Sequence, residues 1–113
     1  MHKIGHIVLV PFPFTDLSGE KVRPALVLGV QNGGDDVTVC FLSSHVPDKI
    51  HKFEVLVDEK EKDFKKTGLK SNSIIKVTKI ATLDKAVVLG QIGELDVKSM
   101  QKVKSILKVY LGL

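Results

Sequence analysis

The sequence is poor in cysteine, in aromatic residues and in arginine, and each shortage excludes a class of protein. Of its 113 residues one is a cysteine, none is a tryptophan and 5% are aromatic. The single cysteine, Cys40, excludes an internal disulfide and a multi-cysteine zinc site. The longest apolar run, residues 7–14, is interrupted by Pro11 and Pro13, so no segment is long enough to span a membrane. Because the N-terminal residues show no secretory signal, we expect a cytoplasmic protein.

The composition that remains is that of an ordinary globular protein with a mild excess of positive charge. Hydrophobic residues make up 43% of the chain and charged residues 27%, and the length suits a single domain over residues 1–113. The net charge of +4 mildly favours a polyanionic partner. Of the 17 basic residues only Arg23 is an arginine, the residue whose planar, always-charged fork suits phosphate oxygens.

The apolar pattern predicts a mainly β (α+β) fold with one helix. β-Branched or alternating runs predict strands at residues 5–10, 25–30, 37–42, 53–57 and 73–80. Residues 11–21 are expected to form an ordered loop, and residues 58–67 a surface turn or short helix. Residues 82–85 resemble a helix start, although residues 87–89 are equally suited to extend a strand. After Asp96, a good N-cap, apolar residues recur at helical spacing up to Gly112. Short connections favour antiparallel pairing, and hence a small barrel of about five strands with a C-terminal helix.

Five segments in this order resemble one known family: residues 5–12 (GHIVLVPF), 23–28 (RPALVL), 42–44 (LSS), 73–85 (SIIKVTKIATLDK) and 92–95 (IGEL). The chain resembles the PemK/MazF-type toxins, the sequence-specific endoribonucleases of type II toxin–antitoxin pairs. The resemblance implies an SH3-like five-stranded antiparallel barrel, a homodimer, and cleavage of single-stranded mRNA without a cofactor. It also implies a cognate antitoxin that inserts an acidic tail into the basic RNA groove. No spacing of histidines suggests a metal site, so we expect none.

The resemblance places catalysis on Arg23 and Ser43. Metal-free RNA cleavage uses the neighbouring 2′-hydroxyl as nucleophile and leaves a 2′,3′-cyclic phosphate. Arg23 would then stabilise the pentavalent phosphate through two hydrogen bonds; the alternative is a surface ion pair with Asp16 or Glu20. Ser43 stands where the family usually has threonine, and it keeps the hydroxyl that hydrogen-bonds to phosphate.

RNA contacts are expected from the first loop and from two strands, at Phe14, Thr15, Ser44, His45, Lys76 and Thr78. Strand alternation predicts that Ser43 and Ser44 point to opposite faces, so that only one reaches the site. His45 is either an acid–base group or an exposed loop histidine. Lys76 and Thr78 occupy positions where some members carry an arginine and an acid. They share a strand face, where they either contact RNA or form a solvated pair.

Other functions are compatible with the same barrel. A non-nucleolytic toxin of this fold would bind a protein target such as DNA gyrase, and a catalytically degenerate member would only bind its partner. A hydrolase built on a serine and His45 is a weaker alternative, because the sequence lacks a nucleophile-elbow pattern.

Overall fold

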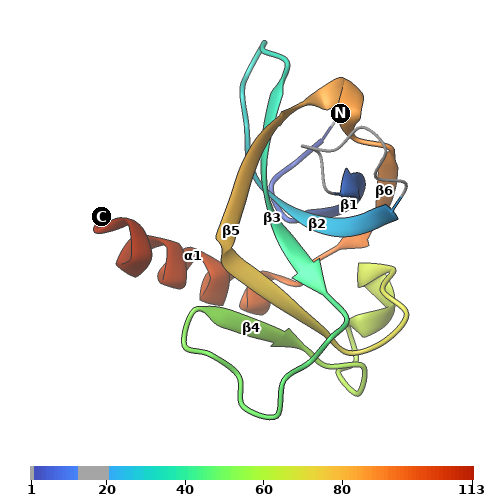
Figure 1. Cartoon of the computed structure of the whole chain (residues 1–113), viewed down its shortest axis with the longest axis vertical. Coiled ribbons are helices and arrows are strands. Elements are labelled where there is room, and N and C mark those ends of the chain that lie inside the picture. The colour runs from blue at the N-terminus through green and yellow to red at the C-terminus, as the bar shows by residue number, and fades with distance from the viewer. Residues whose placement is uncertain (1, 13–20) are drawn as a thin grey trace.

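A curled antiparallel sheet and one C-terminal helix make up most of the fold. The computed structural model describes residues 2–12 and 21–113. The strands are β1 (His6–Phe12), β2 (Lys21–Val30), β3 (Asp36–Ser43), β4 (Glu54–Val57), β5 (Ser73–Asp84) and β6 (Gly90–Glu94). The helices are α1 (Val97–Leu111) and two short 3-10 turns, η1 (Phe64–Thr67) and η2 (Lys85–Val87). The strand order is β4-β5-β3-β2-β1-β6, with every neighbouring pair antiparallel. The sheet curls into a barrel, and α1 lies outside the curl beside β4 (Figure 1).

The mainly β barrel with a C-terminal helix is confirmed, with a sixth strand in place of the five expected. β6 pairs with β1 and was not foreseen. The helix start expected at residues 82–85 is present only as the single 3-10 turn η2, which begins at Lys85 with the Asp84 side chain accepting the Ala86 N–H, because β5 continues to Asp84. Residues 58–67 include the short helix η1. The helix after Asp96 is confirmed: the Ser99 N–H donates to Asp96 Oδ2 over 2.9 Å, and the chain leaves α1 at Gly112 with φ of 72°.

The strands around the first loop are longer than the sequence indicates. β1 continues through Pro11 to Phe12 and β2 begins at Lys21, so only residues 13–20 of the expected loop remain, and these lie outside the described residues. Pro24 is accommodated inside β2 because β3 partners begin only at Ala25. Its missing N–H therefore removes no bond between β2 and β3. No helix in the described part of the chain is long and apolar enough to cross a membrane.

Both faces of the sheet are apolar, so the molecule has two hydrophobic cores. The core inside the curl contains Val8, Val10, Ala25, Val27, Val37, Val39 and Leu83. The core between the sheet and α1 contains Ile7, Leu26, Cys40, Leu42, Val55, Val57, Ile75, Val77, Leu95, Met100 and Val103. Cys40 is fully buried in this second core, and burial raises the pKa of its thiol to about 12. Along one strand, alternate residues therefore face one core, and the residues between them face the other core.

β5 contributes to both cores because it contains a bulge of three unpaired residues. Its first part pairs Lys76 with Phe41, but its second part pairs Ile80 with Cys40, the adjacent residue of β3. The three residues between, 77–79, have no pairing partner on β3. Because three is odd, the bulge reverses the facing of the strand: Ile75 packs toward α1, whereas Leu83 packs inside the curl. The bulge also bends β5 sharply (Figure 1).

Candidate functional site

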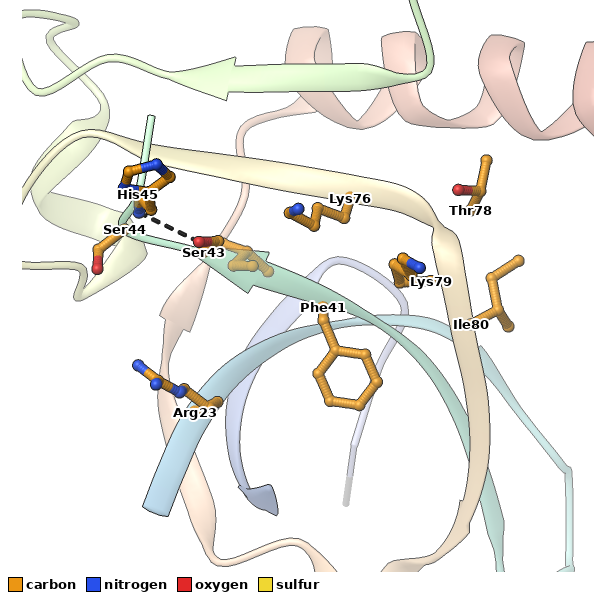
Figure 2. A pocket seen from close by; sticks show the side chains of 10 residues that line it. Arg23, Phe41, Ser43, Ser44, His45, Lys76, Thr78, Lys79 and Ile80 are labelled. Carbon is orange, nitrogen blue, oxygen red and sulfur yellow. Dashed lines mark hydrogen bonds between the residues drawn. The ribbon is translucent and has the colours of Figure 1, made fainter. Parts of the chain in front are cut away.

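A cleft of about 710 Å³ opens where β2 begins, β3 ends and β5 bends. Its lining comes from these three strands and from the two residues that follow β3: Arg23, Phe41, Leu42, Ser43, Ser44, His45, Lys76, Thr78, Lys79 and Ile80 (Figure 2). Six of the eight residues proposed from the sequence line it, namely Arg23, Ser43, Ser44, His45, Lys76 and Thr78. The other two, Phe14 and Thr15, lie outside the described residues.

Arg23 and Ser43 come to the same cleft because β2 and β3 separate there. Pairing between these strands begins at Ala25 and Phe41, and the same register continued by two residues would set Arg23 opposite Ser43. The ladder does not extend that far, so the two strand ends diverge and leave the cleft between them. On its other side Arg23 pairs with Val10 of β1, which fixes its backbone while its side chain is exposed.

The end of β3 orients the Ser43 hydroxyl. The backbone N–H of His45 donates to Ser43 Oγ over 3.1 Å, as the dashed line in Figure 2 shows. This bond occupies one acceptor position of the oxygen and leaves the hydroxyl proton available to a ligand. The expectation that only one of Ser43 and Ser44 reaches the site is wrong, because both line the cleft. Alternation stops where β3 ends at Ser43, so Ser44 already lies outside the strand.

The bend in β5 supplies the opposite wall. Lys76 and Thr78 both line the cleft and are half-buried. Lys79 and Ile80 line this wall too; strict alternation would send Lys79 to the other face, and the bulge brings it to the wall. Lys79 is exposed, whereas the aromatic ring of Phe41 is half-buried and packs against the core inside the curl.

Phe41, Lys79 and Ile80 were not foreseen as lining residues. Phe41 was within reach of sequence reasoning, because it precedes Ser43 by two positions and therefore shares its face of β3. Ile80 was also within reach, because it follows Lys76 by four positions and Thr78 by two. Lys79 depends on the bulge, which no pattern in the sequence of β5 reveals, and its position follows from the offset in pairing between β3 and β5.

The cleft is cationic and suits a polyanion. It contains the charged groups of Arg23, Lys76 and Lys79, and no carboxylate among the described residues lines it. Within residues 2–12 and 21–113, ion pairs join Lys66 to Asp63 and Lys85 to Asp35, so none involves the cleft cations. The alternative partners of Arg23 expected from the sequence, at positions 16 and 20, lie outside the described residues. The described residues also contain no group of three or more histidine, cysteine or acidic side chains placed to hold a metal ion.

The protein is therefore a small, curled antiparallel barrel with a C-terminal helix and a basic cleft lined by β2, β3 and β5. Residues 3–111 match the family described as the PemK-like, MazF-like toxin of type II toxin–antitoxin systems, and the chain belongs to this family. No curated protein matches the sequence significantly.

Solved structures share the fold over almost the whole chain. One is an endoribonuclease in complex with its cognate antitoxin from Mycobacterial species, with 20% identity, 100% of this chain and 97% of that chain covered, and a TM-score of 0.75. Another is MazF from Deinococcus radiodurans, with 22% identity, 99% and 97% covered, and a TM-score of 0.75. A MazE–MazF structure from the same organism has 22% identity, 99% and 96% covered, and a TM-score of 0.75. At these identities the likeness establishes the fold.

Proposed function

We propose that the protein is a sequence-specific endoribonuclease that cleaves single-stranded mRNA without a metal ion, as the toxin of a type II toxin–antitoxin system. The observation that carries the proposal is the meeting of Arg23 and Ser43 in a cleft lined by two further cations and by no described carboxylate. Membership of the PemK/MazF-like toxin family supports the same activity. Because mRNA is the substrate, the toxin would act in the cytoplasm.

Each group of the cleft has a role in this chemistry. The 2′-hydroxyl attacks the adjacent phosphate, which develops negative charge on its equatorial oxygens before the 5′-oxygen leaves. The Arg23 guanidinium would bind two of these oxygens at once. The Ser43 hydroxyl, whose oxygen already accepts the N–H of His45, would donate its proton to a phosphate oxygen. Lys76 and Lys79 on the opposite wall would bind the phosphates of neighbouring nucleotides.

Contacts to the bases would give the sequence specificity. Unpaired bases stack on aromatic side chains, and the Phe41 ring lines the cleft between Arg23 and the β5 wall (Figure 2). Thr78 and Ser44 offer hydrogen-bonding groups for base edges. We add Phe14 and Thr15 to this set from the family resemblance.

The proposed partners are a cognate antitoxin and a second copy of the chain. Two of the solved relatives are complexes with an antitoxin, and a cationic cleft attracts an acidic peptide as readily as it attracts RNA. An acidic antitoxin segment in the cleft would block substrate by occupying the phosphate positions. The exposed apolar residues Val109, Leu111 and Leu113 at the end of α1 leave surface for a homodimer to cover.

Cleavage of a long RNA in excess EDTA tests the proposal. Purified protein should cut a long single-stranded RNA at a short recurring sequence and leave 2′,3′-cyclic phosphate ends. Arg23→Ala should abolish the cuts, and Arg23→Lys should lose most activity because it keeps the charge but not the two-pronged geometry. Lys104→Ala, which removes an exposed cation of α1 outside the cleft, is the control.

Intact RNA at high protein concentration, together with growth arrest on expression, would overturn the proposal. That pair of results would favour a toxin that binds a protein target. Intact RNA without growth arrest would indicate a catalytically degenerate member.

A further inference from the structure

Proton transfer is the part of the proposed reaction that Arg23 and Ser43 leave unassigned. The attacking 2′-hydroxyl must lose a proton, so an acceptor is needed within the cleft. Arginine and lysine side chains carry only donors, and serine and threonine hydroxyls are weak bases at neutral pH. These types account for every polar side chain of the described lining except one.

The exception is His45, the single imidazole that lines the cleft within the described part of the chain. Imidazole is the only side chain that in its ordinary state exchanges a proton between pH 5 and 8. His45 is exposed, so a substrate can reach it. Its backbone N–H donates to Ser43 Oγ over 3.1 Å, which ties its main chain to one of the two groups proposed to bind the phosphate.

We propose that His45 is the general base that activates the 2′-hydroxyl of the RNA. The inference rests on the endoribonuclease function proposed above. The 2′-oxygen forms a bond to phosphorus as its proton passes to a ring nitrogen of His45. The bond from phosphorus to the 5′-oxygen breaks with its electron pair, and that oxygen takes a proton from water. The imidazolium then returns its proton to solvent, which leaves a 2′,3′-cyclic phosphate, a free 5′-hydroxyl and the neutral imidazole.

The charged side chains that line the cleft together with His45 come from two strands. They are Arg23 on β2 and Lys76 and Lys79 on β5, and the residues beside His45 in the chain, Ser44 and Val46, are neutral. Donors to the phosphate are therefore abundant, and the described lining offers one basic acceptor. This inventory favours the role of base over that of acid for His45.

The test is single-turnover cleavage by the full-length protein at saturating concentration, measured from pH 5 to 8.5. The wild-type rate should rise with pH, because a general base acts in its unprotonated form. His45→Gln should lower the rate at pH 7.5 by at least about 100-fold and remove that rise. Because the bond to Ser43 Oγ comes from the His45 main chain, the substitution leaves it in place. His51→Gln, on an exposed histidine outside the cleft, should match the wild type.

Two further measurements separate catalysis from structure and from binding. Free imidazole should restore cleavage to His45→Gly and leave Arg23→Ala inactive. His45→Gln should bind an RNA carrying a 2′-O-methyl group at the scissile nucleotide with nearly the wild-type Kd. If the wild type cleaves and His45→Gln keeps its rate and pH profile, or loses only affinity, the inference is overturned and the proposed function stands. If the wild type itself does not cleave RNA, the proposed function has failed instead.

Discussion

Salt sensitivity of RNA binding gives the sharpest quantitative prediction from the cleft. Its three cations, Arg23, Lys76 and Lys79, lie on two walls where a single strand would pass. Each phosphate neutralised on a single strand contributes about −0.7 to the slope of log affinity against log salt. Three contacts give a slope of about −2.1, so a fourfold rise in salt should weaken binding about 18-fold. Removing one cation should reduce the slope to about −1.4 and the loss to about 7-fold.

Lys79→Ala is the informative variant, because Lys79 was found only through the bulge in β5 and its side chain is exposed. Fluorescence anisotropy with an RNA that carries a 2′-O-methyl group at the scissile nucleotide would give Kd between 50 and 200 mM salt without cleavage. Lys104→Ala on α1 is the matched control and should keep the wild-type slope. A wild-type slope of log affinity against log salt near zero, or a Lys79→Ala slope equal to that of the wild type, would refute the proposal that these cations bind RNA phosphates.

Three further predictions concern the frame that holds the cleft. A Cβ on Gly93 would meet the backbone of η1, so Gly93→Ala should lower the free energy of unfolding by about 1–3 kcal/mol in urea titrations. Gly90→Ala is the control and should leave the free energy of unfolding nearly unchanged, because the space around Gly90 is open. The Cys40 thiol, with its pKa raised to about 12 by burial, should resist iodoacetamide at pH 8 in the folded protein and react in guanidinium; labelling of the native state would contradict its burial. Asp96→Ala should cost about 1 kcal/mol of stability at pH 7. Burial opposes ionisation of Asp96, but hydrogen bonds from Ser99 outweigh burial and lower the pKa of its carboxyl. The stability that the ionised Asp96 contributes is therefore complete above the ordinary carboxyl pKa, and it is lost as the pH falls through the pKa of Asp96 in the folded protein. Asp96→Asn keeps a cap without that pH dependence, and equal stability of the alanine variant and the wild type at pH 7 would count against the cap.

The strands that the sequence predicts are those whose residues face a core. Val37 and Val39 in β3, and Val55 and Val57 in β4, lie two positions apart because alternate positions are buried. β6 was not predicted, because its five residues, GQIGE, include two glycines and one apolar side chain. Its place is determined by pairing with β1 and by the close approach of Gly93 to η1, and neither contact leaves a local pattern. The position of β6 is therefore set by long-range pairing, which leaves no periodic pattern in its sequence.

The residues of the candidate site also differ in whether the sequence could predict them. The residues at strand ends, Arg23 and Ser43, were identified from a family resemblance, and they line one cleft because β2 and β3 separate beyond Ala25 and Phe41. Ser44 was assigned to the opposite face because alternation was extended one residue beyond the end of β3. Lys79 was missed because alternation was assumed to continue through β5. In both cases strict alternation along a regular strand gave the wrong face, because these side chains reach the cleft where the regular strand ends or is interrupted.

The bulge in β5 has a consequence for how the length of this segment can change. Residues before it pack against α1 and residues after it pack inside the curl, and the three unpaired residues 77–79 set that exchange of faces. Deleting or inserting one residue there would turn one half of the strand over and expose one set of core side chains. Deleting or inserting two would restore the facing of both halves. The β5 wall of the cleft is therefore free to lengthen or shorten during divergence only in steps of two residues.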